Sequence, residues 1–303
     1  MSQFVELIEV GLRDGLQNEP VILATETKVD YANRLVKVGF KRLQVTSFVN
    51  PAKVPQMADA DALCAQLPQV EGVEFSGLVL NFRGVARLQA AGLHAVDMGV
   101  SASDTHSTKN TGQPTAPKVV EMLEMIASAR ELGLRVRAAV QCAFGCAYEG
   151  AIPQGKVLNI AKQFVEAGVH EIAFADSAGM ANPRQVRDMI RAAKSVIGRT
   201  PLVLHLHDTR GMGLANVLAA LDEGVTRFDV AFGGLGGCLF IEGATGNIAT
   251  EDTTNMLHEM GYTTGIDVEA VAQISNDAQE KLGTTLPSKI ARIMKQPSLT
   301  EGL

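Results

Sequence analysis

The stretch VGLRDGLQN, residues 10–18, decides between the two parallel α/β folds that this chain could adopt. It follows the first apolar, β-branched run of the sequence, FVELIEV at 4–10. An open doubly wound sheet normally carries a phosphate-binding G-x-G-x-x-G loop at this place. The stretch lacks that glycine spacing and carries the charged pair Arg13 and Asp14 instead. We therefore favour a closed barrel over an open sheet.

The rest of the chain repeats one structural unit. Short apolar runs rich in β-branched residues alternate with segments of helical periodicity, and several of these segments end in glycine, as expected at a left-handed helix C-cap. Eight repeats of strand, helix and turn predict an α/β fold, a (β/α)8 TIM barrel. The expected strands are residues 4–10, 42–48, 74–80, 95–101, 135–142, 171–176, 202–208 and 227–233.

A tail follows the eighth expected strand. It begins with the glycine-rich segment 233–252, whose glycines permit close approach of the backbone to a ligand and the motion of a lid. Helical periodicity at 251–261 and 268–283 predicts extra C-terminal helices from about residue 250. Because no Pro/Ser-rich linker interrupts the pattern, we expect residues 1–303 to form a single catalytic domain.

Composition and charge exclude several classes of protein. The chain is 46% hydrophobic and 20% charged, which is an ordinary globular balance. Its formal net charge is −6 and its basic residues are scattered, so we expect no nucleic-acid partner. The N-terminus lacks the features of a secretory signal, and no apolar run reaches the roughly 20 residues that span a bilayer. We expect a cytoplasmic protein with no membrane partner and with reduced cysteines; homo-oligomer formation is left open.

Residues 203–208, VLHLHD, place two histidines on one face of an expected strand. Side chains alternate along a strand, so His205 and His207 point the same way, and two imidazoles on one face can share a metal ion. The alternative is a satisfied core histidine beside a solvated one. Asp14 is the natural carboxylate partner, and added oxygen ligands favour Mg²⁺ or Mn²⁺. Asp208 faces the other side and is expected to be a turn residue.

Polar residues gather where the expected strands end. The C-terminal ends of barrel strands converge on one face, and the active sites of such barrels lie there. This convergence favours the metal site over the core-histidine alternative. The residues concerned are Arg13, Asp14, Gln44, Thr46, Ser47, Asn81, Ser101, Ser103, Gln141, Asp176, His205, His207 and Asp208.

Longer motifs in the sequence resemble the 3-hydroxy-3-methylglutaryl-CoA lyases. That family belongs to a wider set of barrel metalloenzymes, which includes isopropylmalate and homocitrate synthases. R-D-G-x-Q and H-x-H mark the wider set, whereas the cysteine loop is characteristic of the lyases. The resemblance runs from about residue 4 to about residue 285. The motifs are GLRDGLQNE (11–19), TSFVNPAKVPQMAD (46–59), CAFGCAYEG (142–150), HLHDTRGMGLAN (205–216) and GGLGGCLFIEGATGNIATED (233–252).

The resemblance implies a set of metal ligands and an acyl-CoA thioester substrate. Asp14, His205, His207 and Asn247 match the ligands of the divalent cation, with water and substrate oxygens completing its coordination. Arg13 matches the arginine that engages the acyl-CoA near the bond that breaks. Among these residues, Arg13, Asp14 and His205 are the expected catalytic side chains.

The resemblance also implies further residues of the active site. Cys238 matches the catalytic cysteine, and within the matched loop we favour this role over that of a buried structural thiol. Ser47, Lys53 and Asn81 fall in segments that line the substrate and CoA channel. Gln44 stands in the strand 2 segment close to the metal aspartate and is expected to contact the substrate.

The implied reaction is a retro-Claisen cleavage of 3-hydroxy-3-methylglutaryl-CoA to acetyl-CoA and acetoacetate, a step of leucine degradation. The C3 hydroxyl must lose a proton while a carbanion develops at C2. A metal that binds the hydroxyl oxygen lowers its pKa, and Arg13 can stabilise charge on the thioester oxygen. Cys238 could then protonate the carbanion or help relay the hydroxyl proton, and the identity of the base that takes the hydroxyl proton is left open.

Two positions depart from the family pattern. Gln44 stands where the family usually has glutamate, and Ala173 stands where it commonly has a serine that helps hold the far carboxylate of the substrate. Both changes weaken recognition of the glutaryl end. A lyase for citramalyl-CoA or a longer 3-hydroxyglutaryl-CoA is therefore an alternative, as is an acyltransferase that condenses acetyl-CoA with a 2-oxoacid. A non-catalytic binding barrel is the remaining alternative.

Overall fold

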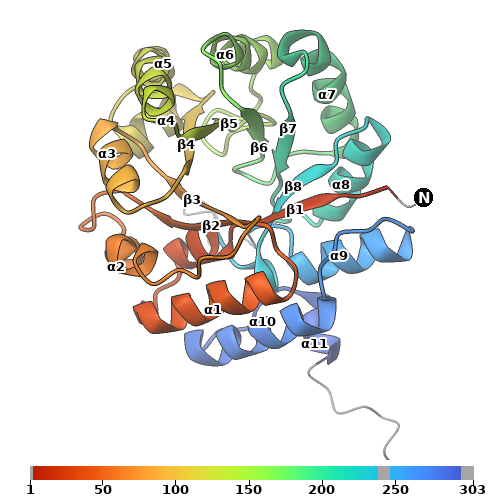
Figure 1. Ribbon diagram of the computed structural model, residues 1–303. Coiled ribbons are helices and arrows are strands. Elements are labelled where there is room, and N and C mark those ends of the chain that lie inside the picture. Colours follow the sequence, from red (N-terminus) through yellow and green to blue (C-terminus); the bar gives the residue numbers. More distant parts are fainter. Residues whose placement is uncertain (1–2, 238–245, 295–303) are drawn as a thin grey trace, which may run out of the picture.

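The computed structural model describes residues 3–237 and 246–294, and within these residues eight parallel strands form a closed barrel (Figure 1). Each strand pairs with the next one along the chain, and the last pairs with the first. The strands are β1 (Glu6–Glu9), β2 (Arg42–Ser47), β3 (Glu74–Leu78), β4 (Ala95–Ser101), β5 (Arg135–Gln141), β6 (Glu171–Ala175), β7 (Leu202–His205) and β8 (Arg227–Val230).

Helices surround the barrel in Figure 1, and the last three helices of the chain form a layer next to the first helix. In that layer Asp277 accepts a hydrogen bond from Arg34 at 3.0 Å, which joins α10 to α1. None of the described helices is both long enough and apolar enough to cross a bilayer. The helices are α1 (Thr25–Lys37), α2 (Ala60–Cys64), α3 (Phe82–Ala90), α4 (Asp104–Thr111), α5 (Thr115–Glu131), α6 (Gln154–Glu166), α7 (Pro183–Ile197), α8 (Gly213–Asp222), α9 (Thr250–Glu259), α10 (Val268–Leu282) and α11 (Lys289–Met294).

The barrel, its eight strands and the extra C-terminal helices are confirmed, but several strands are shorter than expected. The first spans residues 6–9 of the expected 4–10, and the eighth ends at Val230, before a 3-10 turn at Phe232–Gly234. The expected strand 202–208 ends at His205. His207 lies beyond it and forms an isolated antiparallel bridge with Asn247. Sequence periodicity does not predict α2, α4 or α11, because these helices are short and α4 is polar on all sides.

The inside of the barrel is filled from its N-terminal end. There the fully buried Glu171 carboxylate forms ion pairs with Arg42, Arg135 and Arg227. A small apolar cluster of Ile8, Val10, Ala173 and Val203 fills the middle of the barrel. This packing leaves the C-terminal ends of the strands to surround a cavity, as the fold predicts.

Candidate metal centre and active-site cavity

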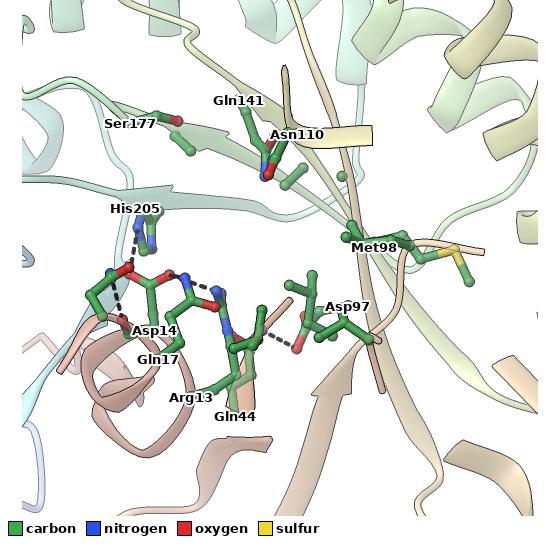
Figure 2. Close-up of a pocket in the computed structure, with 18 of the residues that line it drawn as sticks. Arg13, Asp14, Gln17, Gln44, Asp97, Met98, Asn110, Gln141, Ser177 and His205 are labelled. Carbon is green, nitrogen blue, oxygen red and sulfur yellow. Dashed lines mark hydrogen bonds and ion pairs between the residues drawn. The ribbon is translucent and has the colours of Figure 1, made fainter. Parts of the chain in front are cut away.

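A cavity of about 620 Å³ lies at the C-terminal ends of the strands (Figure 2). Its volume is in the ordinary range for a small-molecule site. Of the residues expected at the site, it is lined by Arg13, Asp14, Gln44, Lys53, Gln141, His205 and His207. The strands and loops that carry these residues are far apart in the sequence, so barrel closure is what brings them together.

Asp14, His205 and His207 form a cluster that could hold a metal ion. One ligand atom from each of the three side chains lies within 4.8 Å of the other two. The two imidazole Nε2 atoms are 3.0 Å apart, and Asp14 Oδ2 lies 3.6 Å from Nε2 of His205 and 4.0 Å from Nε2 of His207. Two imidazoles and a carboxylate directed at one point are a donor set suited to a divalent cation.

Asn247 completes one side of this cluster. Its Nδ2 donates to Asp14 Oδ2 at 2.8 Å and to the Leu235 carbonyl at 3.1 Å. Its Oδ1 and the Nδ1 of His207 are buried, and neither has a hydrogen-bond partner within the described part of the chain. Buried polar atoms rarely stay unsatisfied, so the unpaired Oδ1 of Asn247 beside the three convergent ligands fits a cation site, whereas Nδ1 of His207 lies on the side of the ring that faces away from the cluster.

The charges around the cluster keep its ligands in the forms that bind a cation. Burial, together with the neighbouring His205, lowers the pKa of His207 to about 4, so the imidazole is neutral at pH 7. Burial alone would raise the pKa of Asp14, but Arg13 and the two histidines hold that pKa well below its usual range. Metal ions bind neutral imidazole and ionised carboxylate, which are the forms present here.

A π-helical turn, η1 (Gly11–Gly15), presents Arg13 and Asp14 directly after β1. The carbonyl of Val10 accepts hydrogen bonds from the backbone N–H groups of Arg13 at 3.0 Å and of Asp14 at 2.7 Å. A Cβ at Gly15 would lie 2.7 Å from Cβ of Leu235. Glycine is therefore needed at this position so that the segment after β8 can pack against the turn.

Glu9 fastens the same turn to the end of β8. Its Oε1 accepts hydrogen bonds from the backbone N–H groups of Gly11 at 2.7 Å and Phe232 at 3.1 Å. Its Oε2 accepts from the Thr250 hydroxyl at 2.7 Å. The fully buried carboxyl thus joins the first strand, the turn after the eighth strand and α9, and so fixes the turn that carries the candidate metal ligand Asp14.

Arg13 is held on both sides of its guanidinium. Its Nη1 donates to Asp14 Oδ1 at 2.5 Å, and its Nε donates to the amide oxygen of Gln44. The Gln44 amide nitrogen in turn donates to Asp97 Oδ2 at 2.5 Å. This row of Asp14, Arg13, Gln44 and Asp97 can be followed along one side of the cavity in Figure 2.

The row continues through the floor of the cavity to the metal cluster. Arg137 Nε donates to Asp97 Oδ1, and its Nη1 donates to Asp229 Oδ1 at 2.6 Å. Asp229 Oδ2 lies 3.1 Å from Nδ1 of His205. A carboxylate on the far nitrogen of a histidine fixes its tautomer and directs Nε2 at a metal. The side chains from Asp14 round to His205 therefore form a closed circuit.

Three charged members of this circuit, Asp97, Arg137 and Asp229, were missed by sequence reasoning. Each stands in the middle of an apolar strand, AVDMGVS, RVRAAVQ or RFDV. Charged residues are rarely fully buried unless they are paired, so an isolated charge inside a core strand is the signal that could have found them.

The remaining predicted residues lie in different places. Ser47 is buried, and Asn81 caps α3 by accepting a hydrogen bond from Gly84 N at 2.9 Å; neither residue lines the cavity. Asp208 accepts from Gly213 N at 2.7 Å, which agrees with the turn role expected of it. Cys238 lies outside the described residues.

Comparisons with known proteins place this chain among related sequences. The HMGL-like family model matches residues 4–278. A hydroxymethylglutaryl-CoA lyase of Bacillus subtilis is 37% identical over 291 residues, which cover 96% of this chain and 97% of that protein. An (R)-citramalyl-CoA lyase of Chloroflexus aurantiacus is 38% identical over 298 residues, covering 95% of this chain and 94% of that protein.

A solved structure has the same fold and aligns with nearly the whole of this chain. An HMG-CoA lyase of Acinetobacter baumannii, in complex with coenzyme A and 3-methylmalate, superposes with a TM-score of 0.92 at 37% identity. The alignment covers 98% of this chain and 97% of that one. Sequence and structure thus match over nearly the whole length, including the strands that carry the metal cluster.

Proposed function

Because the chain belongs to the HMGL-like family, we propose that it is a metal-dependent lyase that splits the C2–C3 bond of a 3-hydroxyacyl-CoA. The first substrate to test is 3-hydroxy-3-methylglutaryl-CoA, which would yield acetyl-CoA and acetoacetate. The observation that carries the proposal is the convergence of Asp14, His205 and His207 beside Arg13 in the 620 Å³ cavity.

The metal cluster would hold Mg²⁺ or Mn²⁺. Asp14, His205 and His207 supply the convergent ligands, and the buried Oδ1 of Asn247 is a fourth candidate. When bound, a divalent ion supplies the Lewis acidity that lowers the pKa of a substrate hydroxyl. Asp229 orients the His205 ring, so the ligand geometry is set before substrate enters.

The chain's own side chains would handle the charge that moves during cleavage. The hydroxyl proton passes to a general base, the C3–O bond becomes a carbonyl, and the C2–C3 electron pair becomes an enolate that takes up a proton from a general acid to give acetyl-CoA. Arg13, with Nε and Nη1 engaged by protein, keeps Nη2 for the enolate oxygen. Cys238 is proposed as the donor of that last proton, on the strength of the family resemblance.

Replacing Arg13 by glutamine is expected to lower kcat by about 10²–10³-fold with little change in KM, because its charge matters most once the enolate develops. Steady-state release of acetyl-CoA measures both constants. Arg13→Lys is the matched control, because it keeps the charge but loses the fork of donors, and it should recover only part of the loss. A loss confined to KM would assign Arg13 to ground-state binding instead.

A second candidate substrate is supported by the shape of the cavity. On the side of the cavity formed by β4, β5 and β6, small side chains stand at Gly99, Ala139, Ala173 and Ala175, next to the charged Asp97 and Arg137 of the floor. Ala175 is the register partner of His205, so this side of the cavity begins beside the metal cluster. The absence of a side-chain hydroxyl at these four positions suits an acyl group other than the glutaryl chain, and the similarity to a citramalyl-CoA lyase points the same way.

A substrate panel decides between these candidates. Chelated enzyme is assayed with and without Mg²⁺ or Mn²⁺ for acetyl-CoA release from 3-hydroxy-3-methylglutaryl-CoA, citramalyl-CoA and longer 3-hydroxyglutaryl-CoA derivatives. We expect metal-dependent cleavage of at least one thioester, and the highest kcat/KM identifies the substrate. Metal-independent turnover, or CoA release from acetyl-CoA plus a 2-oxoacid without any cleavage, would overturn the proposed lyase reaction.

A further inference from the structure

Gln44 occupies an unusual position between a cation and an anion. It is 1% exposed, and its amide oxygen accepts from Arg13 Nε while its amide nitrogen donates to Asp97 Oδ2 at 2.5 Å. A glutamine can serve both neighbours because one end of an amide accepts and the other end donates. A carboxylate at position 44 could serve only the arginine.

Asp97 fixes which way the amide points. Its Oδ2 also accepts from the Ser76 hydroxyl at 2.6 Å, and its Oδ1 accepts from Arg137 Nε. Asp97 is buried, and each of its two oxygens already faces a donor, Ser76 Oγ at Oδ2 and Arg137 Nε at Oδ1. The donor end of Gln44 must therefore face Asp97, and its oxygen must face Arg13. The orientation of the Gln44 amide thus follows from its two partners.

We propose that Gln44 and Asp97 are a matched pair of positioning residues that set the place and the free charge of Arg13. The role of Arg13 in this proposal rests on the proposed function. With a neutral amide on Nε, the guanidinium has one carboxylate partner, Asp14 on Nη1, and a neutral neighbour on its other side. Only one carboxylate therefore offsets the positive charge of Arg13, and the guanidinium can still stabilise negative charge that develops on an enolate oxygen.

The pair explains why the residue common in the family would be harmful in this chain. Glutamate at position 44 would place a second carboxylate within hydrogen-bond distance of Asp97 Oδ2, where both side chains are more than nine-tenths buried in the lining of the cavity. Two buried carboxylates at that distance cannot both stay ionised. Either a proton is taken up or the contact opens, and in both cases the link that holds Arg13 is changed.

A double-mutant cycle of Gln44→Glu, Asp97→Asn and the double variant tests the pair. In the double variant the new amide nitrogen at position 97 takes the place of Oδ2, and it donates to the new carboxylate at position 44 and to the Ser76 oxygen. The amide oxygen at position 97 still accepts from Arg137, and the carboxylate at position 44 still accepts from Arg13. The donor and acceptor roles are exchanged, and every link of the circuit is kept.

Each single variant is expected to lower kcat/KM by about 30-fold or more, mainly through kcat. The double variant should recover part of that loss, to about 10-fold below wild type, because the exchange restores the place of Arg13 while the carboxylate at position 44 still offsets part of its free charge. Ser76→Ala is the matched control. It removes a bond to Asp97 without touching Gln44 or Arg13, and its kcat/KM should stay within about 5-fold of wild type, as expected for one neutral donor.

Two results would overturn the matched pair: a Gln44→Glu variant as active as wild type, or a double variant no better than the worse single variant. Urea unfolding supplies a readout that does not need activity. The free energies of unfolding should be coupled, so that the double variant is more stable than the summed effects of the single variants predict. If wild type cleaves none of the thioesters, the proposed function fails. The unfolding measurement still tests the matched pair in that case, because coupled free energies of unfolding support the pair and additive ones reject it.

Discussion

Replacing His207 by alanine is expected to lower kcat for thioester cleavage by about 10³-fold, the rate equivalent of roughly 4 kcal/mol, because it removes a ligand of the divalent cation. Binding of Mn²⁺, followed by the electron paramagnetic resonance signal of the free ion, should weaken in parallel. The reason is geometric, since the Nε2 of His207 lies 3.0 Å from that of His205 and 4.0 Å from Asp14 Oδ2.

The matched control is His94→Ala, which removes an exposed histidine just before β4 and should change neither kcat nor Mn²⁺ affinity. His207 is 7% exposed, so the circular dichroism spectrum and the unfolding midpoint of the variant must be measured as well. A folded His207→Ala enzyme with unchanged Mn²⁺ binding and near-normal kcat would remove the histidine from the metal site.

Replacing Glu171 by alanine is expected to lower the free energy of unfolding by about 3–5 kcal/mol, because it leaves the arginine charges at the closed end of the barrel without their shared partner. Glu171 is fully buried, and Arg42, Arg135 and Arg227 approach its carboxylate at 2.5, 3.1 and 3.1 Å. Urea unfolding at pH 7 measures the loss. Asp222→Asn is the control, since its ion pair with Arg187 is largely exposed and should contribute less than about 1 kcal/mol.

The Glu171 network also has a predicted pH dependence. Burial alone would raise the pKa of Glu171, but Arg42 and the other arginines hold it below its usual value. A lowered pKa in the folded state adds stability that is complete above the unfolded-state pKa and is lost as the pH falls toward the folded-state pKa. Wild type should therefore lose this stability in acid, and Glu171→Ala should lose less between about pH 5 and pH 3. If the free energies of unfolding of wild type and Glu171→Ala fall equally between these pH values, the pH dependence does not come from Glu171.

The strand pattern could be predicted from sequence because it is a local property repeated along the chain. Each apolar, β-branched run has a helical segment and a turn after it, and the absence of a phosphate-binding glycine pattern in residues 10–18 excluded the open sheet. Short helices were missed for the same reason. The helix α4, DTHSTKNT, has no apolar stripe, and its start depends on Ser103 capping His106 N at 3.1 Å.

The convergence of Asp14, His205 and His207 was predicted from the sequence and is seen in the structure, although strand alternation was only part of the reason. β7 ends at His205, so His207 owes its orientation to the bridge with Asn247 in the segment after β8. Sequence spacing contains no information on that long-range contact. The prediction worked because barrel closure brings the ends of β1, β7 and β8 together.

The circuit through the cavity floor could not be derived from spacing. Gln44, Asp97, Arg137 and Asp229 come from four different strands, and their pairing depends on the register and tilt of the closed sheet. From sequence, Gln44 looked like the loss of a charge. The structure shows that a carboxylate stands one step away at Asp97, where the glutamine donates to it. The glutamine at position 44 is therefore explained by its contact with Asp97, which is seen only in the folded structure.

The central claim is that Asp14, His205 and His207 hold the divalent ion on which cleavage depends. Pulsed electron paramagnetic resonance of Mn²⁺ bound to chelated, ¹⁵N-histidine-labelled enzyme tests it most directly, together with acetyl-CoA release from the same samples. We expect couplings to two histidine nitrogens, one of them lost in His207→Ala, and turnover that rises with bound Mn²⁺. Bound Mn²⁺ without histidine coupling, in an enzyme whose turnover ignores the metal, would contradict the claim.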